Sequence, residues 1–476
     1  MILQKSGLFK ATIWYSAGNL FVRLVNFILL PIYSNLISIE QFGIYSLLMS
    51  VYVIAAVFYQ LGMISSFTNF YLKESDAEKR KVVFSSIINT TLMLGGVLTV
   101  IILVLSKFLS QKILGSQDYY LLIDFVFIAL FIDTVSSFIL QLFKTLEQSQ
   151  RVVIYMLVSA ILSFILNILL VYQLKTGIYG IIIAQLVTAA AVFILLLIPI
   201  RKIYLPYIDN RILKAIILFS LPLFFSGLFS SGVDVADRFI IDFFLGKKQV
   251  GEYSFAYRIA MITNIFVISF RTAWTPYALN RYHQKDYKDS FGKTFLKLLS
   301  AGILLLLIVS FFAEDLFKIQ INDKYLFNPQ YKGGLIILPY VILGYIFSSI
   351  AAFYSVYPFV SGKSYHFLIS DGLGLIANIV FNIILIPQLG ILGAGISTCI
   401  SFMIISFYLF IISKNRIEVD YQKKENLIIA LVGILCAVIG LLVNDSVVQL
   451  VLVALFLITV KLAVRIDLVR MFSLTK

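Results

Sequence analysis

Three arginines lie inside long apolar segments of this sequence, where a charged side chain is stable only with a partner or a polar cavity. Arg23 is in the first apolar segment, and Arg258 and Arg271 are both in the eighth. Arg23 is about 12 residues, or roughly 18 Å at 1.5 Å per residue, from the start of its segment. A cation at that depth costs at least about 2.5–3.5 kcal/mol unless it faces a wet cavity or a partner. Because a guanidinium group binds phosphate oxygens through paired hydrogen bonds, the arginines predict either a cationic cavity for an anion or ion pairs between helices.

Two amide side chains accompany the first of these arginines. Asn19 and Asn26 are four residues before and three residues after Arg23, so a helix places all three on one face. Buried amides most often hold neighbouring helices together. Their position beside Arg23 makes them candidates for lining the same cavity.

Three acidic residues in apolar segments could bind a coupling proton or sodium ion. Asp133 is deep in the fourth segment, Asp237 is in the seventh, and Asp371 is near the start of the eleventh. A carboxyl group removed from water holds its proton more tightly, which suits proton exchange. Simple pairing with the arginines is the alternative for each of them, and the sequence does not rank the two readings.

One further arginine, Arg238, has an acidic residue four positions to either side. Asp234 and Asp242 share its helix face, which predicts a neutralising ladder. Under this interpretation Asp237 points elsewhere and is unpaired within its own helix.

The sequence predicts no metal site, no cofactor and no enzyme active site. Cys399 and Cys436 are both in apolar segments without metal-ligand spacing, and His283 and His366 are isolated. The stretch 372–377 matches a dinucleotide-binding pattern, but it lacks the preceding strand that such a site requires. A membrane-embedded glycosyltransferase would need a large loop with catalytic acids, and the longest outward loop is too short to hold an acid/base pair rigidly.

The elements that must position these residues are membrane-spanning helices. The chain has 61% apolar and 13% charged residues, whereas soluble proteins have about 45–50% and 25%. Apolar segments long enough to span a bilayer recur along it. We predict an all-α integral membrane protein with about 14 transmembrane helices at 11–37, 44–71, 82–106, 120–143, 152–172, 178–200, 215–245, 250–280, 294–313, 333–358, 366–387, 391–412, 427–443 and 447–464.

The basic residues are distributed unevenly between the two sides of the predicted membrane. Alternate connecting segments, counted from the N-terminus, hold 25 Lys and Arg residues, whereas the opposite set holds 8. The positive-inside rule therefore predicts that both termini are cytoplasmic. This orientation signal also accounts for the net charge of +14, so we expect no nucleic-acid partner.

The chain repeats itself at an interval of six helices. Phe42-Gly43-Ile44-Tyr45-Ser46 follows the first helix, and Val250-Gly251-Glu252-Tyr253-Ser254 follows the seventh. A stretch from Asn167 to Gly180 matches one from Asn382 to Gly393, with two extra residues in the first copy. An even interval gives both halves the same orientation. We therefore expect parallel six-helix bundles at 1–205 and 206–426, followed by an extra helix pair and cytoplasmic tail at 427–476.

Several short motifs resemble those of the polysaccharide-unit (O-antigen, Wzx-type) flippases. These flippases belong to the multidrug/oligosaccharidyl-lipid/polysaccharide exporter superfamily. The resemblance covers residues 11–412, and the order and spacing of the motifs carry it. The motifs are Leu30-Pro31-Ile32-Tyr33-Ser34 with Gly43-Ile44-Tyr45-Ser46, Leu221-Pro222-Leu223, Asp237-Arg238, Phe244-Leu245-Gly246, and Asn382 through Pro387 to Gly393-Ala394-Gly395. One departure is Tyr172-Gln173, where the second copy has Ile386-Pro387.

The resemblance implies a substrate, a location and partners. It implies transport of an undecaprenyl-diphosphate-linked oligosaccharide across the bacterial inner membrane, from the cytoplasmic to the periplasmic leaflet, for O-antigen or capsule synthesis. It also implies a V-shaped bundle with a cationic lumen, in which Arg23, Arg258 and Arg271 would hold the diphosphate. A polysaccharide polymerase in the same membrane is a candidate partner.

Two other transport functions remain open at this stage. A peptidoglycan-precursor flippase is one, since its headgroup is also an anionic diphosphate. A multidrug or cation antiporter of the same superfamily is the other, although it would require an acid-rich lumen and usually has 12 helices.

Overall fold

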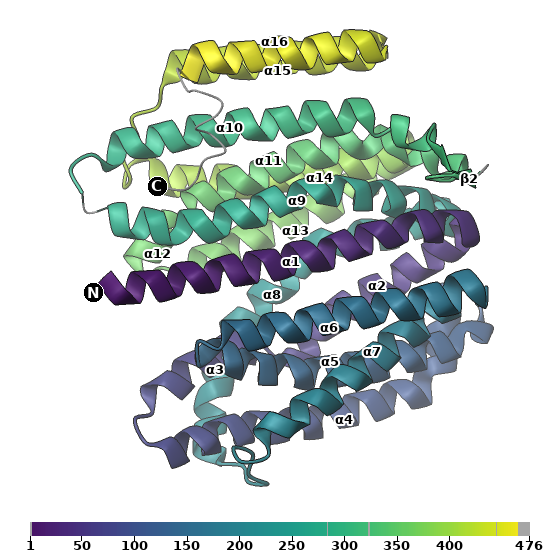
Figure 1. Cartoon of the computed structure of the whole chain (residues 1–476), viewed down its shortest axis with the longest axis vertical. Helices are drawn as coiled ribbons and strands as arrows, with labels where there is room; N and C mark the ends of the chain where they lie inside the picture. The colour runs from purple at the N-terminus through teal and green to yellow at the C-terminus, as the bar shows by residue number, and fades with distance from the viewer. Residues whose placement is uncertain (1, 283, 322–323, 444, 465–476) are drawn as a thin grey trace. The chain divides into compact units, whose positions relative to one another are not determined.

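The computed structural model describes the chain apart from residues 1, 283, 322–323, 444 and 465–476. Within the described residues the fold is helical except for one two-stranded hairpin (Figure 1). Fourteen of the described helices are long and apolar enough to cross a membrane. The predicted all-α membrane fold and its helix number are therefore confirmed.

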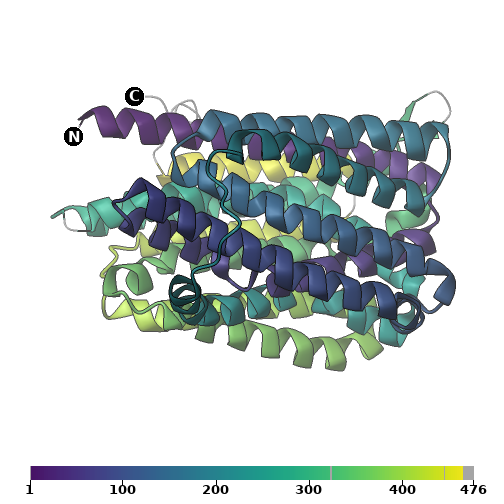
Figure 2. The same ribbon diagram turned by 90° about the horizontal axis from the view of Figure 1, so that it is seen from below.

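The described chain divides into two compact units. The first runs to Asp242 and includes 246–251, and its long helices share a common direction (Figure 2). Its elements are α1 (Ile2–Leu36), α2 (Ile39–Gln60), α3 (Met63–Lys73), α4 (Ala77–Leu114), the 3-10 helix η1 (Gln117–Tyr119), α5 (Tyr120–Thr145), α6 (Ser149–Asn167), the π-helix η2 (Ile168–Gln173), α7 (Ile178–Ile200) and nearly all of α8 (Asn210–Leu245).

The second unit contains 243–245 and the chain from Glu252. Its elements are most of α9 (Lys247–Arg281), α10 (Tyr287–Phe312), the 3-10 helix η3 (Asp315–Phe317), strands β1 (Gln320–Ile321) and β2 (Lys324–Tyr325), the 3-10 helix η4 (Pro329–Ile337), α11 (Leu338–Tyr354), α12 (Val356–Ser361), α13 (Tyr365–Leu389), α14 (Ile391–Lys414), α15 (Lys423–Val443) and α16 (Ser446–Val464). The strands are antiparallel, with Gln320 opposite Tyr325.

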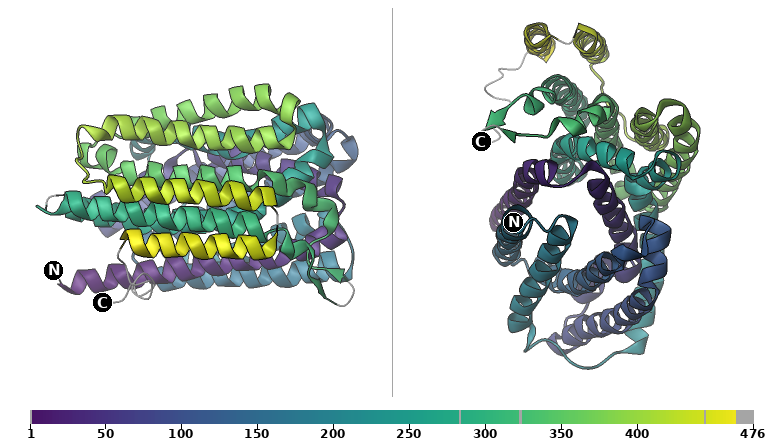
Figure 3. Two further views of the ribbon diagram at one scale, coloured as in Figure 1. Left: turned by 90° about the horizontal axis from the view of Figure 1, so that it is seen from above. Right: turned by 90° about the vertical axis from the view of Figure 1, so that its right-hand side faces the viewer.

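Each unit is built around buried apolar clusters. In the first unit, one cluster joins α3, α4, α5, α6, α7 and the start of α8. In the second unit, one cluster joins α9, α10, α11 and α14, and another joins α10 to α15 and α16. The extra helix pair lies side by side and is attached to the second unit through α10 (Figure 3).

The segment between α7 and α8 is fixed to α4 by hydrogen bonds. Asn89 Nδ2 donates to the carbonyls of Leu205 and Tyr207 at 3.0 and 3.1 Å, and the backbone N–H of Asp209 donates to Ser86 Oγ at 2.9 Å. These bonds hold the start of α8 in the first unit. The sequence repeat instead assigns this helix to the second six-helix bundle, 206–426, and that division remains a prediction.

The second span, 44–71, was predicted to be one continuous helix, and this prediction is wrong. It is divided into α2 and α3 at Leu61 and Gly62, which have φ values of 47° and 68°. A left-handed backbone cannot continue an α-helix, so the chain bends there. Ser66 Oγ, on α3, and Ser220 Oγ, on α8, are 2.6 Å apart and hold α3 against α8 beyond the bend.

The structure places both repeat matches at equivalent points. Gly43 is the fifth residue of α2 and Gly251 is the fifth residue of α9. Gly177 and Gly390 precede α7 and α14 with nearly the same backbone angles, φ/ψ of 61°/−139° and 62°/−144°. The copies differ locally: the first copy forms the π-helix η2 after Asn167, whereas the second copy stays α-helical to Leu389 in α13.

The two glycines of the first repeat match pack reciprocally within the first unit. A Cβ on Gly43 would lie 1.9 Å from the carbonyl oxygen of Lys247, and one on Gly251 would lie 2.0 Å from that of Ile39. Real Cβ atoms cannot approach backbone so closely. The starts of α2 and α9 can therefore meet only because both positions lack a side chain.

We expect Gly251→Ala to lower the melting temperature of the purified protein in detergent by several degrees. The added methyl group must push two backbones apart, and such overpacking costs about 1–3 kcal/mol. Gly96→Ala on α4 is the matched control, since a Cβ there would meet nothing within 4 Å. Equal melting temperatures for the two variants would show that the α2–α9 approach is not close.

Candidate functional site

Arg23 lies on α1, the helix that packs against α6. It is half-buried, whereas Asn19 and Asn26 on the same face are exposed. No carboxylate of the described residues lies within 4.0 Å of its guanidinium group. The structure thus brings these three predicted residues together on one helix face and gives the cation no acidic partner there. Its contact with a central cavity remains a prediction.

The other two predicted arginines share one helix but cannot act on one group together. Arg258 is half-buried and Arg271 is exposed on α9, 13 residues apart. At 1.5 Å and 100° per residue they are separated by about 20 Å along the helix and roughly 140° around it. A diphosphate is far shorter than that separation. These two arginines can therefore contact a diphosphate only in succession, and their role in holding it remains a prediction.

Asp133 lies on α5 with a neutral partner. Tyr52 Oη, on α2, donates a hydrogen bond to Asp133 Oδ2 at 2.8 Å. No basic group of the described residues is within 4.0 Å of this carboxyl, so its predicted pairing with an arginine is not found. An isolated carboxylate in an apolar interior is costly unless it binds a proton or a cation. Among the described residues Asp133 therefore has a hydrogen-bond donor beside it but no cation.

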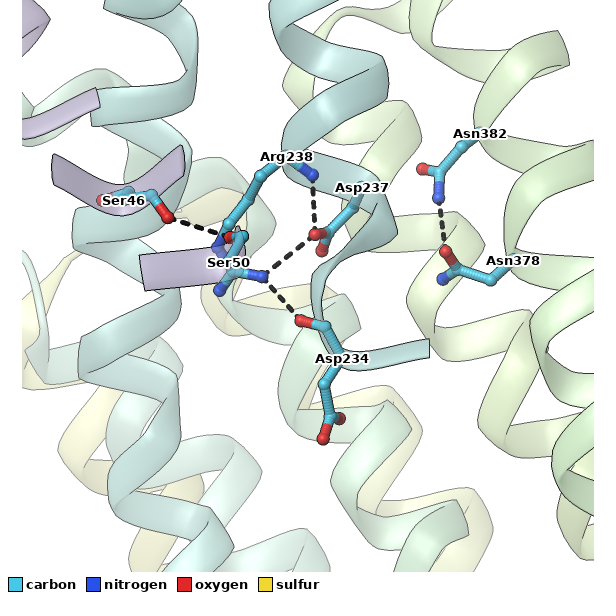
Figure 4. A network of polar contacts seen from close by, with 7 residues as sticks. All are labelled: Ser46, Ser50, Asp234, Asp237, Arg238, Asn378 and Asn382. Carbon is cyan, nitrogen blue, oxygen red and sulfur yellow. Dashed lines mark hydrogen bonds and ion pairs between the residues drawn. The ribbon is translucent and has the colours of Figure 1, made fainter. Parts of the chain in front are cut away.

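The predicted ladder around Arg238 is wrong in its partners (Figure 4). Arg238 Nη1 forms an ion pair with Asp237 Oδ1 at 3.0 Å and donates to the backbone carbonyl of Asp234 at 2.6 Å. Asp242 is paired instead with Lys247, at 3.2 Å. The long arginine side chain turns back along α8 and reaches the carboxylate next to it. Asp237 is fully buried and paired, contrary to the expectation that it has no partner within its helix.

Two buried amides lie on α13, beyond the predicted acid Asp371. Asp371 itself is half-buried near the start of this helix. Asn382 Nδ2 donates to Asn378 Oδ1 at 2.8 Å, and both side chains are fully buried (Figure 4). Asn378 Nδ2 and Asn382 Oδ1 have no hydrogen-bond partner among the described residues. The two amides therefore hold each other within one helix, with hydrogen-bonding capacity left over.

One contact of a candidate residue that the sequence did not predict is the hydrogen bond from the Tyr52 hydroxyl to Asp133. The two residues are 81 positions apart, and Tyr52 is one of 27 tyrosines. Tyrosine in an apolar helix is usually read as an interface residue or as packing. Only the pairing of α2 with α5 reveals the bond.

Two family models match the chain. The model described as "Polysaccharide biosynthesis protein" matches residues 8–280, which is more than half of the 476 residues. The model described as MatE matches residues 222–384. Both matches overlap the region 11–412 that carries the resemblance noted from the sequence motifs.

Curated relatives include one long match and two partial ones. An uncharacterised membrane protein of Methanocaldococcus jannaschii is 22% identical over 92% of this chain and 90% of its own length. A capsular polysaccharide biosynthesis protein of Staphylococcus aureus is 26% identical over 41% of this chain and 50% of its own length. A probable low-salt glycan biosynthesis flippase of Haloferax volcanii is 28% identical over 37% of this chain and 36% of its own length.

Solved structures with the same fold include a lipid flippase and a multidrug transporter. The lipid II flippase MurJ, in an inward closed conformation, is 18% identical with a TM-score of 0.75, covering 98% of this chain and 99% of its own. An inward-facing multidrug resistance MATE transporter is 16% identical with a TM-score of 0.67, covering 83% and 94%. With the family match, this fold shows that the chain belongs to the polysaccharide biosynthesis protein family of multi-pass membrane transporters, within the multidrug/oligosaccharidyl-lipid/polysaccharide exporter superfamily, and is not an enzyme.

Proposed function

We propose that this protein is a flippase for an oligosaccharide repeat unit of O-antigen or capsule type. The unit is linked to undecaprenyl diphosphate and crosses the bacterial inner membrane from the cytoplasmic to the periplasmic leaflet. The observation that carries the proposal is the match of the polysaccharide biosynthesis model to residues 8–280. The capsular and glycan-flippase relatives support the same substrate class.

The arginines in the membrane-spanning helices supply what such a substrate needs. A diphosphate and its sugars cannot cross about 30 Å of hydrocarbon without a polar path. Arg23 holds the headgroup from α1, and Arg258 and Arg271 receive it in turn along α9. Because each contact is separate, the headgroup is never bound so tightly that release becomes slow. Asn19 and Asn26 contact the substrate beside Arg23.

Orientation and partners follow from the charge pattern and the substrate. The split of 25 to 8 basic residues supports cytoplasmic positions for both termini. The substrate therefore enters from the side on which its sugars are assembled. A polysaccharide polymerase in the same membrane takes up the unit after transfer.

Asp133 is the proposed ion-coupling residue. Its only described polar partner is the Tyr52 hydroxyl at 2.8 Å, so a proton or sodium ion would balance its charge. Asp237 already shares its charge with Arg238 at 3.0 Å, and Asp371 is the third candidate, near the start of α13.

Deletion of the gene should make lipid-linked repeat units accumulate with their sugars facing the cytoplasm, and surface polysaccharide should be lost. The block falls between assembly and polymerisation, so the lipid-linked unit is the species that builds up. The measurement is extraction of lipid-linked oligosaccharides together with staining of the surface polymer. A plasmid copy of the gene should restore both.

Two other outcomes would replace the proposal. Accumulation of the peptidoglycan precursor with cell lysis would identify the cell-wall flippase. A change confined to drug resistance would identify the antiporter.

A further inference from the structure

A groove lies on the first unit between α6 and α7, at the end where α6 begins and α7 finishes. Its volume is about 480 Å³, within the range of small-molecule sites. Ile154 and Ile198 on its walls are 57% and 58% exposed. Both helices are long and apolar enough to cross a membrane, and their apolar walls suit an acyl chain. The groove is lined by Arg151, Ile154, Tyr155 and Val158 from α6 and by Leu195 and Ile198 from α7.

Arg151 is the one charged residue of this lining. Its Nη1 donates to Gln148 Oε1 at 2.9 Å, which fixes the guanidinium group with a neutral acceptor. No carboxylate of the described part of the chain is within 4.0 Å of it. Tyr155 is one turn further along the same face, and its ring stacks on Phe143 with an interplanar angle of 12°. The cation and the ring together form a fixed polar end to an apolar groove.

Residues next to the groove add positive charge at the same end. Apart from Arg151 itself, segments 144–151 and 201–214 hold five basic and two acidic residues, and two of the five lie in the connection between α7 and α8. Arg201 and Lys202 follow α7 directly and are exposed. Basic pockets between transmembrane helices, on the membrane face that carries the positive charge, suit anionic lipid headgroups.

We infer that this groove binds one acidic phospholipid of the surrounding bilayer. Its phosphate contacts the Arg151 guanidinium, and one acyl chain lies along the apolar wall between α6 and α7. Charge complementarity selects an acidic headgroup over a zwitterionic one, because a zwitterionic headgroup carries its own cation into a region that is already basic. None of the proposed transport residues on α1 and α9 is part of the lining.

Native mass spectrometry of the full chain with phosphatidylglycerol or phosphatidylcholine tests this inference. We expect phosphatidylglycerol to bind at a concentration about fivefold lower than phosphatidylcholine, as one cation near a headgroup implies. Arg151→Gln should remove that preference, and Arg151→Lys should keep most of it. Lys175→Gln is the matched control, since it removes an exposed cation from the other end of the same helix pair.

A second variant tests the shape of the groove independently of the charge of Arg151. Val158→Trp should fill the groove and weaken binding of both lipids while the arginine is unchanged. The inference is overturned if the wild-type protein binds both lipids equally, or if Lys175→Gln loses the preference as Arg151→Gln does. It is also overturned if equimolar undecaprenyl phosphate displaces phosphatidylglycerol, because the groove would then belong to the transported class of lipid.

Discussion

Arg23→Ala should reduce transport of the lipid-linked oligosaccharide by about tenfold to a hundredfold. Hydrogen bonds to a charged group contribute about 1.5–3 kcal/mol, and alanine removes all of them from the headgroup. Arg23 has no acidic partner within 4.0 Å among the described residues, so its replacement leaves no carboxylate without its ion-pair partner. The protein should therefore fold normally. Surface polysaccharide in the deletion strain, normalised to protein level, is the measurement.

Two further variants make the Arg23 result specific. Arg23→Lys should restore part of the transport, since it keeps the charge but loses the paired hydrogen bonds. Lys297→Ala removes an exposed cation from α10, outside the candidate site, and should leave transport unchanged. Normal export by Arg23→Ala would make this arginine structural.

Asp133→Asn should abolish the dependence of transport on an ion gradient and slow net transport by at least about tenfold. Asparagine keeps the shape and can still bond to the Tyr52 hydroxyl, but it can neither take up a proton nor balance a sodium ion. Tyr52→Phe should preserve coupling and shift its pH dependence, because the carboxyl loses its only described hydrogen bond. Transport into vesicles with imposed proton or sodium gradients measures both effects.

A second acid on the same helix provides the control for Asp133. Asp124, nine residues earlier on α5, is also half-buried, and Asp124→Asn should keep the gradient dependence. If Asp133→Asn transports as the wild type does in every gradient, the carboxyl only anchors α2 to α5.

The number of spans could be predicted because hydropathy is summed over about 20 residues and tolerates local errors. The lengths of α8 and α9 were also predictable, since both are continuous apolar helices of 36 and 35 residues. The break at Leu61 and Gly62 was not, because a leucine and a glycine within an apolar run do not mark a bend. That break depends on a left-handed backbone conformation that the one-dimensional pattern does not contain.

Side-chain partners were predicted less well than helices, for a different reason. The i,i+4 rule favoured Asp234 and Asp242 for Arg238, yet the flexible side chain reaches Asp237. The partner of Asp133 comes from a helix 81 residues away, and apolar helices give little indication of which neighbours they pack against. The face shared by Asn19, Arg23 and Asn26 could be predicted, because helical spacing alone determines it.

Vesicles that contain the purified protein test the central claim most directly. The substrate is a polyprenyl diphosphate carrying a labelled oligosaccharide on the inner leaflet, and the measurement is the fraction of label that an external glycosidase removes. We expect that fraction to rise with time in vesicles containing the wild-type protein and to stay near the protein-free level with Arg23→Ala. A fraction that does not rise with the wild-type protein, under any imposed gradient, would contradict the assignment of this protein as a flippase for lipid-linked oligosaccharides.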